Sequence, residues 1–189
     1  MTSLAPRTQP PPVLFTRVFA DDAEQTLGPA SIEDGRLVVR AQEPALPVGQ
    51  PFDPRPLRDV VIDASMELLE GAPGTTFGMY FRQSSEQRYV LWTVTRERRF
   101  RVGLLDGAYQ PVHDGMLADD IPLHTDAPNR LTVVMLGPSV TFILNDKIVT
   151  GAMVDARFAE GPAGAWLQPG DDTGAALALD WVQVRAVLP

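Results

Sequence analysis

Two carboxylates four residues apart, Asp63 and Glu67, suggest acid–base chemistry in this sequence. Hydrolysis of a glycosidic bond uses two carboxyl groups that lie about 5 to 10 Å apart across the bond. In an extended strand, a rise of about 3.3 Å per residue separates Asp63 from Glu67 by roughly 13 Å. This pair is too widely spaced for either hydrolytic mechanism, so Glu67 would need a second carboxylate from another strand.

Aromatic and cationic side chains further along the chain suggest a binding surface instead. Ligand sites combine aromatic walls with a few polar groups. Tyr80 and Arg82 alternate on one expected strand, and Trp92 and Arg101 follow on the next two. The alternative is that Trp92 packs in the core and that Arg82 is an ion-paired edge residue. We predict no catalytic residue, and a ligand-binding face formed by Asp63, Glu67, Tyr80, Arg82, Trp92 and Arg101.

Basic residues concentrate in the segment 96–101, which holds four arginines in a chain of formal net charge −8. Such a cluster can attract an anion or nucleic acid. Glu97 interrupts it, however, and a hairpin tip is a natural place for solvated charge. Because a net-acidic chain is poorly suited to bind phosphate backbones, we predict no nucleic-acid partner. If the strand 59–70 lies beside the arginine-rich strands, its acids are expected to neutralise much of this charge.

Alternation of apolar and polar residues with a period of two dominates from residue 59 onward. Many short strands, separated by turns every 8 to 12 residues, indicate an all-β fold with two antiparallel sheets. Residues 44–56 contain five prolines and are expected to form a surface excursion between strands. Strands are expected over 13–19, 36–41, 59–69, 77–82, 88–95, 100–104, 129–136, 140–144, 147–150, 161–168 and 175–187.

Length, proline content and the absence of cysteine limit the possible domain organisation and chemistry of the chain. Residues 1–12 are a proline-rich lead-in, and 13–189 form one domain of ordinary size. The sequence has no cysteine, which excludes disulfides and thiolate metal sites. No apolar run is long enough to span a bilayer and no secretory signal is visible, so no membrane partner is expected and the cytoplasm is the default compartment.

The order of several motifs resembles the concanavalin A-like lectin/glucanase jelly roll, in particular its bacterial branch related to family 16 glycoside hydrolases and 3-keto-disaccharide hydrolases. The resemblance covers roughly residues 14 to 187 and rests on motifs such as Asp34-Gly35-Arg36-Leu37, Phe77-Gly78-Met79-Tyr80-Phe81-Arg82, Val140-Thr141-Phe142-Ile143-Leu144-Asn145-Asp146 and Leu179-Asp180-Trp181-Val182-Gln183-Val184. It implies two stacked, curved sheets, of which the concave one often binds sugars.

The same resemblance bears on activity and on metal binding. Family 16 enzymes carry Glu-x-Asp-x-Glu on one strand, but here Ser65 stands in the place of the central acid. Several relatives hold a structural calcium near the chain termini, which suggests Asp21 and Asp180 as ligands and no other cofactor.

Three functions remain open. We expect a non-catalytic domain that binds a carbohydrate on the concave sheet. The first alternative is a glycoside hydrolase-like enzyme that uses Glu67 with a second carboxylate. The second is a structural module that contacts a protein partner through the arginine-rich hairpin or the proline-rich segment.

Overall fold

The chain folds into two antiparallel β-sheets in a computed structural model that describes residues 12–19, 26–27, 29–170 and 174–187. The predicted lead-in therefore lies almost wholly outside the described residues. The strands are β1 (Val13–Val18), β2 (Thr26–Leu27), β3 (Ala30–Glu33), β4 (Arg36–Ala41), β5 (Val48–Leu57), β6 (Val60–Glu70), β7 (Thr76–Ser85), β8 (Arg88–Thr95), β9 (Arg99–Asp106), β10 (Ala108–Met116), β11 (Asn129–Leu136), β12 (Ser139–Leu144), β13 (Lys147–Met153), β14 (Gly161–Gln168) and β15 (Ala175–Ala186). A single 3-10 turn, η1 (Ala156–Phe158), precedes β14. Within these described ranges, no helix has the length and apolar character needed to cross a bilayer.

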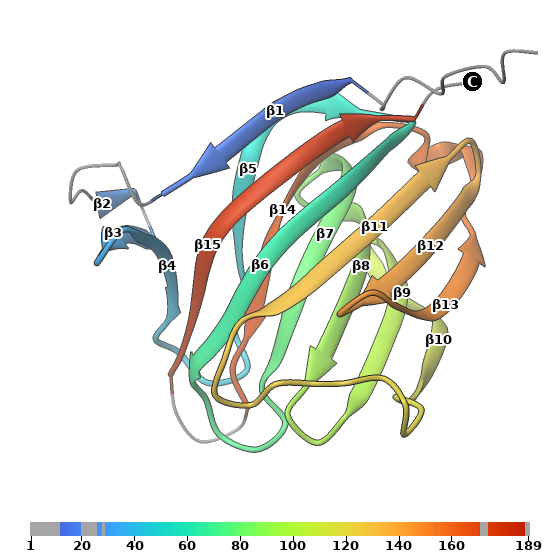
Figure 1. Cartoon of the computed structure of the whole chain (residues 1–189). Coiled ribbons are helices and arrows are strands. Elements are labelled where there is room, and N and C mark those ends of the chain that lie inside the picture. The colour runs from blue at the N-terminus through green and yellow to red at the C-terminus, as the bar shows by residue number, and fades with distance from the viewer. Residues whose placement is uncertain (1–11, 20–25, 28, 171–173, 188–189) are drawn as a thin grey trace, which may run out of the picture.

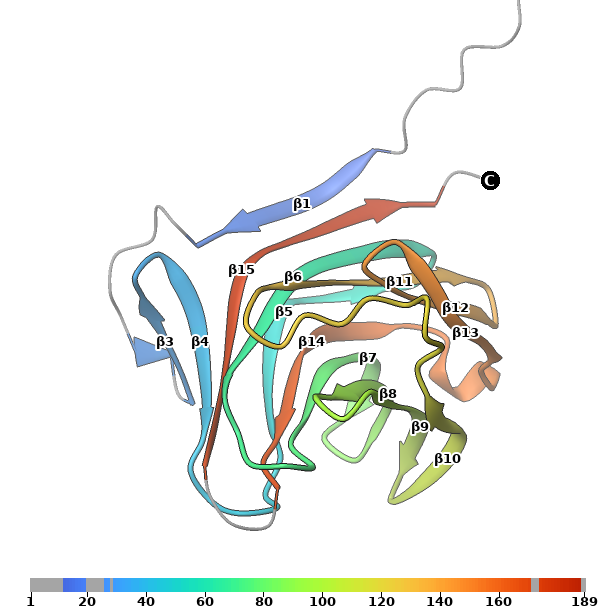
Figure 2. The same ribbon diagram turned by 60° about the horizontal axis from the view of Figure 1, so that its bottom comes forward.

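Sheet A contains β13, β12, β11, β6, β15, β4, β3 and β2 in that order, and β1 pairs with the second half of β15. Sheet B contains β10, β9, β8, β7, β14 and β5. The two sheets lie face to face, with sheet A in front of sheet B (Figure 1). Sheet A curves over sheet B, so the outer face of sheet B lies on the concave side (Figure 2). The predicted all-β sandwich is confirmed.

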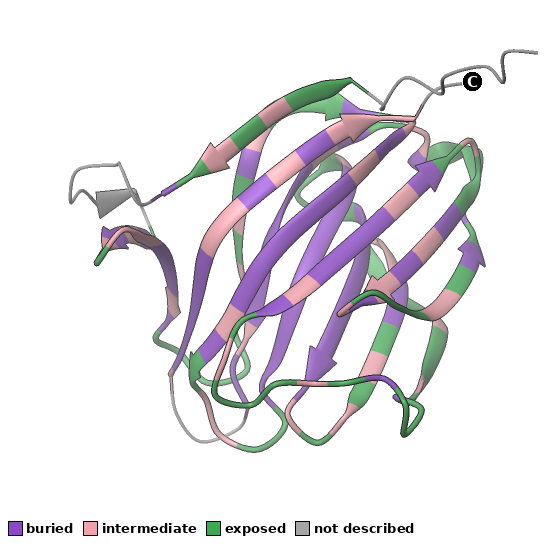
Figure 3. Ribbon diagram, in the orientation of Figure 1, coloured by how far each residue is buried: buried purple, intermediate pink, exposed green. Residues whose placement is uncertain are grey.

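Apolar side chains on the facing sides of the two sheets form the core. On β6, alternate residues from Val60 to Leu68 are at most 5% exposed, as the period-two pattern predicts. The rings of Trp92 in sheet B and Phe142 in sheet A lie 5.4 Å apart and join the two layers. Buried residues follow the central strands of both sheets, whereas β1 and β10 are largely exposed (Figure 3).

The proline-rich segment is a strand, which corrects the prediction of a surface excursion. Residues 48–57 form β5, which pairs with β14 at one edge of sheet B. Proline is tolerated on an edge strand because its missing N–H faces solvent and not a neighbouring strand. Pro51, Pro54 and Pro56 also discourage this edge from pairing with another chain. Period-two alternation does not reveal β5, because three of its ten residues are proline.

Charged residues cover the outer face of sheet A in paired groups. Asp63, 1% exposed, accepts hydrogen bonds from Arg130, Arg185 and Thr132. The neighbouring strands β11 and β15 supply these partners. The strand 59–70 therefore lies in the opposite sheet from the arginine-rich strands β8 and β9, and its Asp63 is neutralised by arginines of its own sheet. The condition for neutralisation between the two regions, that their strands are neighbours, is therefore not met.

Replacing Asp63 with asparagine is expected to lower the free energy of unfolding by about 1.5–3 kcal/mol, because hydrogen bonds to a charged group are lost at a buried position. Urea denaturation measures this change. Asp146→Asn is the matched control, since Asp146 binds the same Arg130 but has a side chain 79% exposed. Its cost should stay below about 1 kcal/mol. Equal losses in the two variants would contradict a special role for the buried carboxylate.

Candidate functional site

An aromatic cluster lies on the outer face of sheet B. Alternation on β7 and β8 turns Tyr80, Tyr89 and Leu91 to this side, and β14 contributes Trp166. The ring of Tyr89 lies 5.9 Å from that of Tyr80 and 5.5 Å from that of Trp166. The three rings pack apart from the main core, so they form a separate apolar layer on the concave side.

This layer borders a pocket of about 400 Å³. Tyr89, Leu91 and Trp166 form part of its wall, and Pro47, Leu105 and Tyr109 are the other apolar or aromatic residues among the described ones that line it. The volume falls within the range of sites for small ligands, which is roughly 300–1,000 Å³. The arrangement therefore provides a hollow in which a compact ligand can contact aromatic faces.

Glycines in neighbouring strands make room for two of the tyrosines. A Cβ atom on Gly103 would lie 2.3–2.5 Å from side-chain atoms of Tyr109, and one on Gly164 would lie 2.5 Å from Tyr80. Each ring thus lies flat against the backbone of an adjacent strand. A glycine within a strand often marks such a close approach, and this signal was present in the sequence but was not used to locate the site.

Gly103→Ala is expected to displace the Tyr109 ring and to distort the pocket without removing any of its side chains. Any ligand of this pocket should then bind at least about threefold more weakly, which titration calorimetry can measure. Gly107→Ala does not serve as a control because Gly107 has a positive φ of 74°. Gly151→Ala is suitable, since its Cβ would meet only a carbonyl oxygen at 3.5 Å. Unchanged affinity in Gly103→Ala would contradict the placement of Tyr109.

Polar groups complete the lining of the pocket. Thr76, Thr93, Gln168 and Arg101 all border it. Thr76 on β7 pairs with Thr95, two residues from Thr93 on β8, and Arg101 is directly opposite Thr93 on β9. Burial raises the pKa of the hydroxyl of Tyr89, so this group stays neutral at ordinary pH. The pocket therefore offers hydroxyl, amide and guanidinium groups beside an apolar wall.

Two of the six residues predicted to bind a ligand lie on this face, Tyr80 and Arg101. Tyr80 is 3% exposed and belongs to the aromatic cluster, while Arg101 borders the pocket itself. Trp92 does not join them. It pairs with Met79, not with Tyr80, so alternation turns it into the core, where it is fully buried. The alternative of a core tryptophan is the one that the structure supports.

The side chain of Arg82 also does not lie on the predicted face, although Arg82 follows Tyr80 by two residues. Its positive φ of 54° marks a break in the register between β7 and β8, which reverses the expected alternation. The side chain is 1% exposed and donates to the carbonyl oxygen of Gly137 at 2.6 Å. Arg82 thus connects sheet B to the β11–β12 turn of sheet A, and the prediction of a shared face with Tyr80 is wrong.

Asp63 and Glu67 lie in the other sheet. Both are on β6 in sheet A, and Glu67 receives a hydrogen bond of 2.6 Å from Arg36. The Nε atom of the same arginine lies 2.8 Å from Asp180. The expectation that Glu67 shares the concave face with Tyr80 is therefore wrong, because strands 60–70 and 76–85 belong to different layers.

The predicted calcium ligands differ in how far the structure describes them. Asp21 lies outside the described residues. Asp180 accepts a hydrogen bond of 2.7 Å from Ser65 and pairs with Arg36. Among the residues placed in the structure, no group of three or more acids and histidines is arranged to hold a metal. Calcium binding by Asp21 and Asp180 stays a prediction.

The arginines of segment 96–101 mostly stabilise the local structure. Arg96 donates to the carbonyl oxygen of Leu68 at 2.7 Å, and Arg98 donates to that of Ala118 at 2.8 Å. These bonds attach the β8–β9 hairpin to β6 and to the loop after β10. The segment is therefore not a continuous basic surface, which leaves Arg101 as its member at the pocket.

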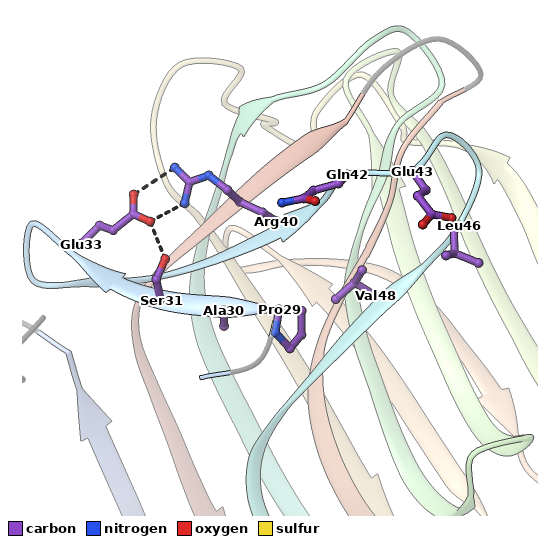
Figure 4. A pocket seen from close by; sticks show the side chains of 9 residues that line it. All are labelled: Pro29, Ala30, Ser31, Glu33, Arg40, Gln42, Glu43, Leu46 and Val48. Carbon is purple, nitrogen blue, oxygen red and sulfur yellow. Dashed lines mark hydrogen bonds and ion pairs between the residues drawn. The ribbon is translucent and has the colours of Figure 1, made fainter. Parts of the chain in front are cut away.

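A second hollow lies between the β3–β4 hairpin and β5 (Figure 4). It has a volume of about 600 Å³. Arg40 and Ser31 both bond the carboxylate of Glu33, and the hydrogen bond from Arg40 is the main cause that lowers the pKa of Glu33. Arg40 and Glu33 neutralise each other in this way, and none of the described residues that line the hollow is aromatic. It is a weaker candidate than the pocket on sheet B.

Comparisons with known proteins agree on the fold. No protein-family model and no curated protein sequence matches the chain. A solved structure of the catalytic domain of an endo-1,3-beta-glucanase from Thermotoga petrophila is similar, with a TM-score of 0.64, 11% identity, and coverage of 91% of this chain and 96% of that one. The carbohydrate-binding module CBM66 from Bacillus subtilis gives a TM-score of 0.59 at 14% identity, with coverage of 90% and 95%.

A third solved structure, a Bacillus subtilis protein of unknown function with a galectin-like fold, gives a TM-score of 0.69 at 14% identity. It covers 93% of this chain and 96% of that one. At these identities the likeness concerns the fold alone. The fold is the concanavalin A-like jelly roll, as the sequence motifs predicted.

Proposed function

We propose that this domain binds a carbohydrate in the pocket on the outer face of sheet B. The observation that carries the proposal is the wall of Tyr89, Leu91 and Trp166 beside the polar side chains of Thr93 and Arg101. A sugar ring has apolar C–H faces and polar edges, so it matches a wall of aromatic faces with hydrogen-bonding groups at its margin.

The fold supports this proposal without establishing it. The same jelly roll serves a glucanase and a carbohydrate-binding module among the similar structures. Fold alone does not decide activity, so the proposal rests on the chemistry of the pocket. The aromatic wall and the position on the concave sheet are the two features that favour a sugar over another small ligand.

The structure favours a binding function over a hydrolase in which Glu67 is the catalytic acid. The carboxylates of Glu67 and Asp180 both pair with Arg36, on the face of the sandwich opposite to the pocket. A general acid must lie within hydrogen-bond reach of the bond it cleaves, and neither of these carboxylates lines the pocket. The proposed function therefore needs no catalytic pair.

A glycan array probed with the labelled domain tests the proposal. We expect binding to at least one class of oligosaccharide, and loss of that signal when Trp166 is replaced by alanine. The absence of binding to all neutral and acidic glycans on the array would contradict the proposal. Binding that persists in Trp166→Ala would place the sugar elsewhere on the molecule.

A further inference from the structure

We infer that the sugar recognised by this pocket carries a negative charge, such as the carboxylate of a uronic acid. This inference rests on the proposed function and specifies its ligand class. Arg101 is the one charged side chain among the described residues that line the pocket. A cation beside an otherwise uncharged wall distinguishes an acidic sugar from a neutral one of the same shape.

The contacts of Arg101 leave donors for a ligand. Its Nε lies 3.4 Å from a carboxylate oxygen of Asp114 on the adjacent strand β10. Within the part of the chain that the structure describes, the two terminal nitrogens of this guanidinium have no hydrogen-bond partner. The side chain is 48% exposed. An arginine with two terminal N–H donors side by side suits a carboxylate, which it can bind through two parallel hydrogen bonds.

The charge around Arg101 is positive in spite of the acidic chain. Asp114 is shared with Arg99, whose Nη1 lies 3.9 Å from its other oxygen. Two guanidinium groups and one carboxylate leave one unbalanced positive charge at this rim of the pocket. The formal net charge of −8 for the whole chain repels anions in general, so affinity for an acidic sugar must come from this local excess.

Nearby neutral groups fit the same ligand. Tyr109 lies close enough to Arg101 and Asp114 for both charges to influence the pKa of its hydroxyl, which burial raises. Thr93 stands opposite Arg101 in the β8–β9 register and also borders the pocket. A sugar whose apolar face rests near Trp166 can therefore direct its hydroxyl groups to the threonine and its carboxylate to the arginine.

The test compares each acidic sugar with its own neutral form. Oligomers of galacturonic, glucuronic and mannuronic acid are titrated beside their methyl esters, which keep the shape and lose the charge. We expect at least one acid to bind about tenfold or more tightly than its ester. We also expect this preference to weaken between 50 and 500 mM salt, because the cation is half exposed.

Two arginine variants identify the source of the preference. Arg101→Gln should reduce the preference for the acid to less than about threefold while binding of the ester is kept. Arg88→Gln is the matched control, since Arg88 is a partly exposed arginine of sheet B that pairs with Asp106 and does not line the pocket. It should retain most of the preference. A preference that survives in Arg101→Gln, or falls equally in both variants, overturns the role of Arg101.

The two levels of the proposal fail differently. If the wild-type domain binds neutral glycans through Trp166 and shows no preference for acids, the inference about charge is wrong and the proposed function stands. If neither acidic nor neutral sugars bind, both are wrong.

Discussion

Replacing Trp92 with alanine is expected to lower the free energy of unfolding by about 3–5 kcal/mol, as is usual when a large aromatic side chain is removed from a core. Trp92 is fully buried and packs against Phe142 of the opposite sheet. Its removal would leave a cavity between the two layers, and that cavity cannot collapse without moving strands in both sheets. Chemical denaturation followed by circular dichroism gives the change directly.

Trp181→Ala is the control for this prediction. Trp181 lies opposite Ser65 on the outer side of sheet A and is only partly buried. Its truncation should cost clearly less than that of Trp92. If the Trp92 variant lost less than about 1 kcal/mol, Trp92 would not occupy the position between the sheets. Trp92→Phe, which keeps a ring in the core, should recover most of the stability.

Replacing Trp166 with alanine is expected to reduce carbohydrate affinity by at least about tenfold, the loss typical of a central aromatic residue in a binding site. Trp166 borders the pocket and is in contact with Tyr89, so its removal deletes part of the apolar wall and also frees its neighbour to move. Titration calorimetry with a sugar found on the array measures the change.

The effect of Trp166→Ala on folding stability must be separated from its effect on carbohydrate affinity. Trp166 is 9% exposed, so its truncation also weakens folding, and binding should be measured below the unfolding transition of the variant. Trp181→Ala again provides the control, because it lies in the other sheet and should bind as the wild type does. Equal losses of affinity in the two variants would indicate a general effect on the fold.

Much of the architecture could be predicted from residue periodicity. The strands 36–41, 88–95, 129–136 and 161–168 have the predicted limits, because each is rich in apolar residues and is bounded in the sequence by residues typical of turns. The strand 48–57 was missed because prolines suppress the β signal locally, although an edge position tolerates them. The strand 108–116 was missed because nearly all its residues are exposed and it lacks alternation.

The site was harder to predict because it depends on which strands are neighbours. Tyr80 and Arg101 were placed correctly on one face, since each lies in a regular strand. Trp92 was placed on the wrong face because its partner across the β7–β8 ladder is Met79, and the sequence does not give this register. Arg82 follows a local reversal of the backbone that no pattern of residue types announces.

Partners of charged residues could not be predicted either. Neutralisation of the arginines in segment 82–101 by the acids of strand 59–70 depended on whether these strands are neighbours, which the sequence does not show. The sandwich separates these strands into two layers, and Asp63 instead binds Arg130 and Arg185, more than sixty residues away. Tyr89 and Trp166, the centre of the candidate site, were not proposed as ligand-binding residues because their proximity arises only when β14 pairs with β7.

The location of the bound sugar tests the central claim most directly. Backbone amide shifts recorded by NMR during titration with a sugar identified on the array give that location without any mutation. The largest changes are expected at Thr76, Thr93, Arg101 and Gln168, around the pocket on sheet B. Changes centred instead on Ser31, Glu33 and Arg40, in the hollow between β3, β4 and β5, would contradict it.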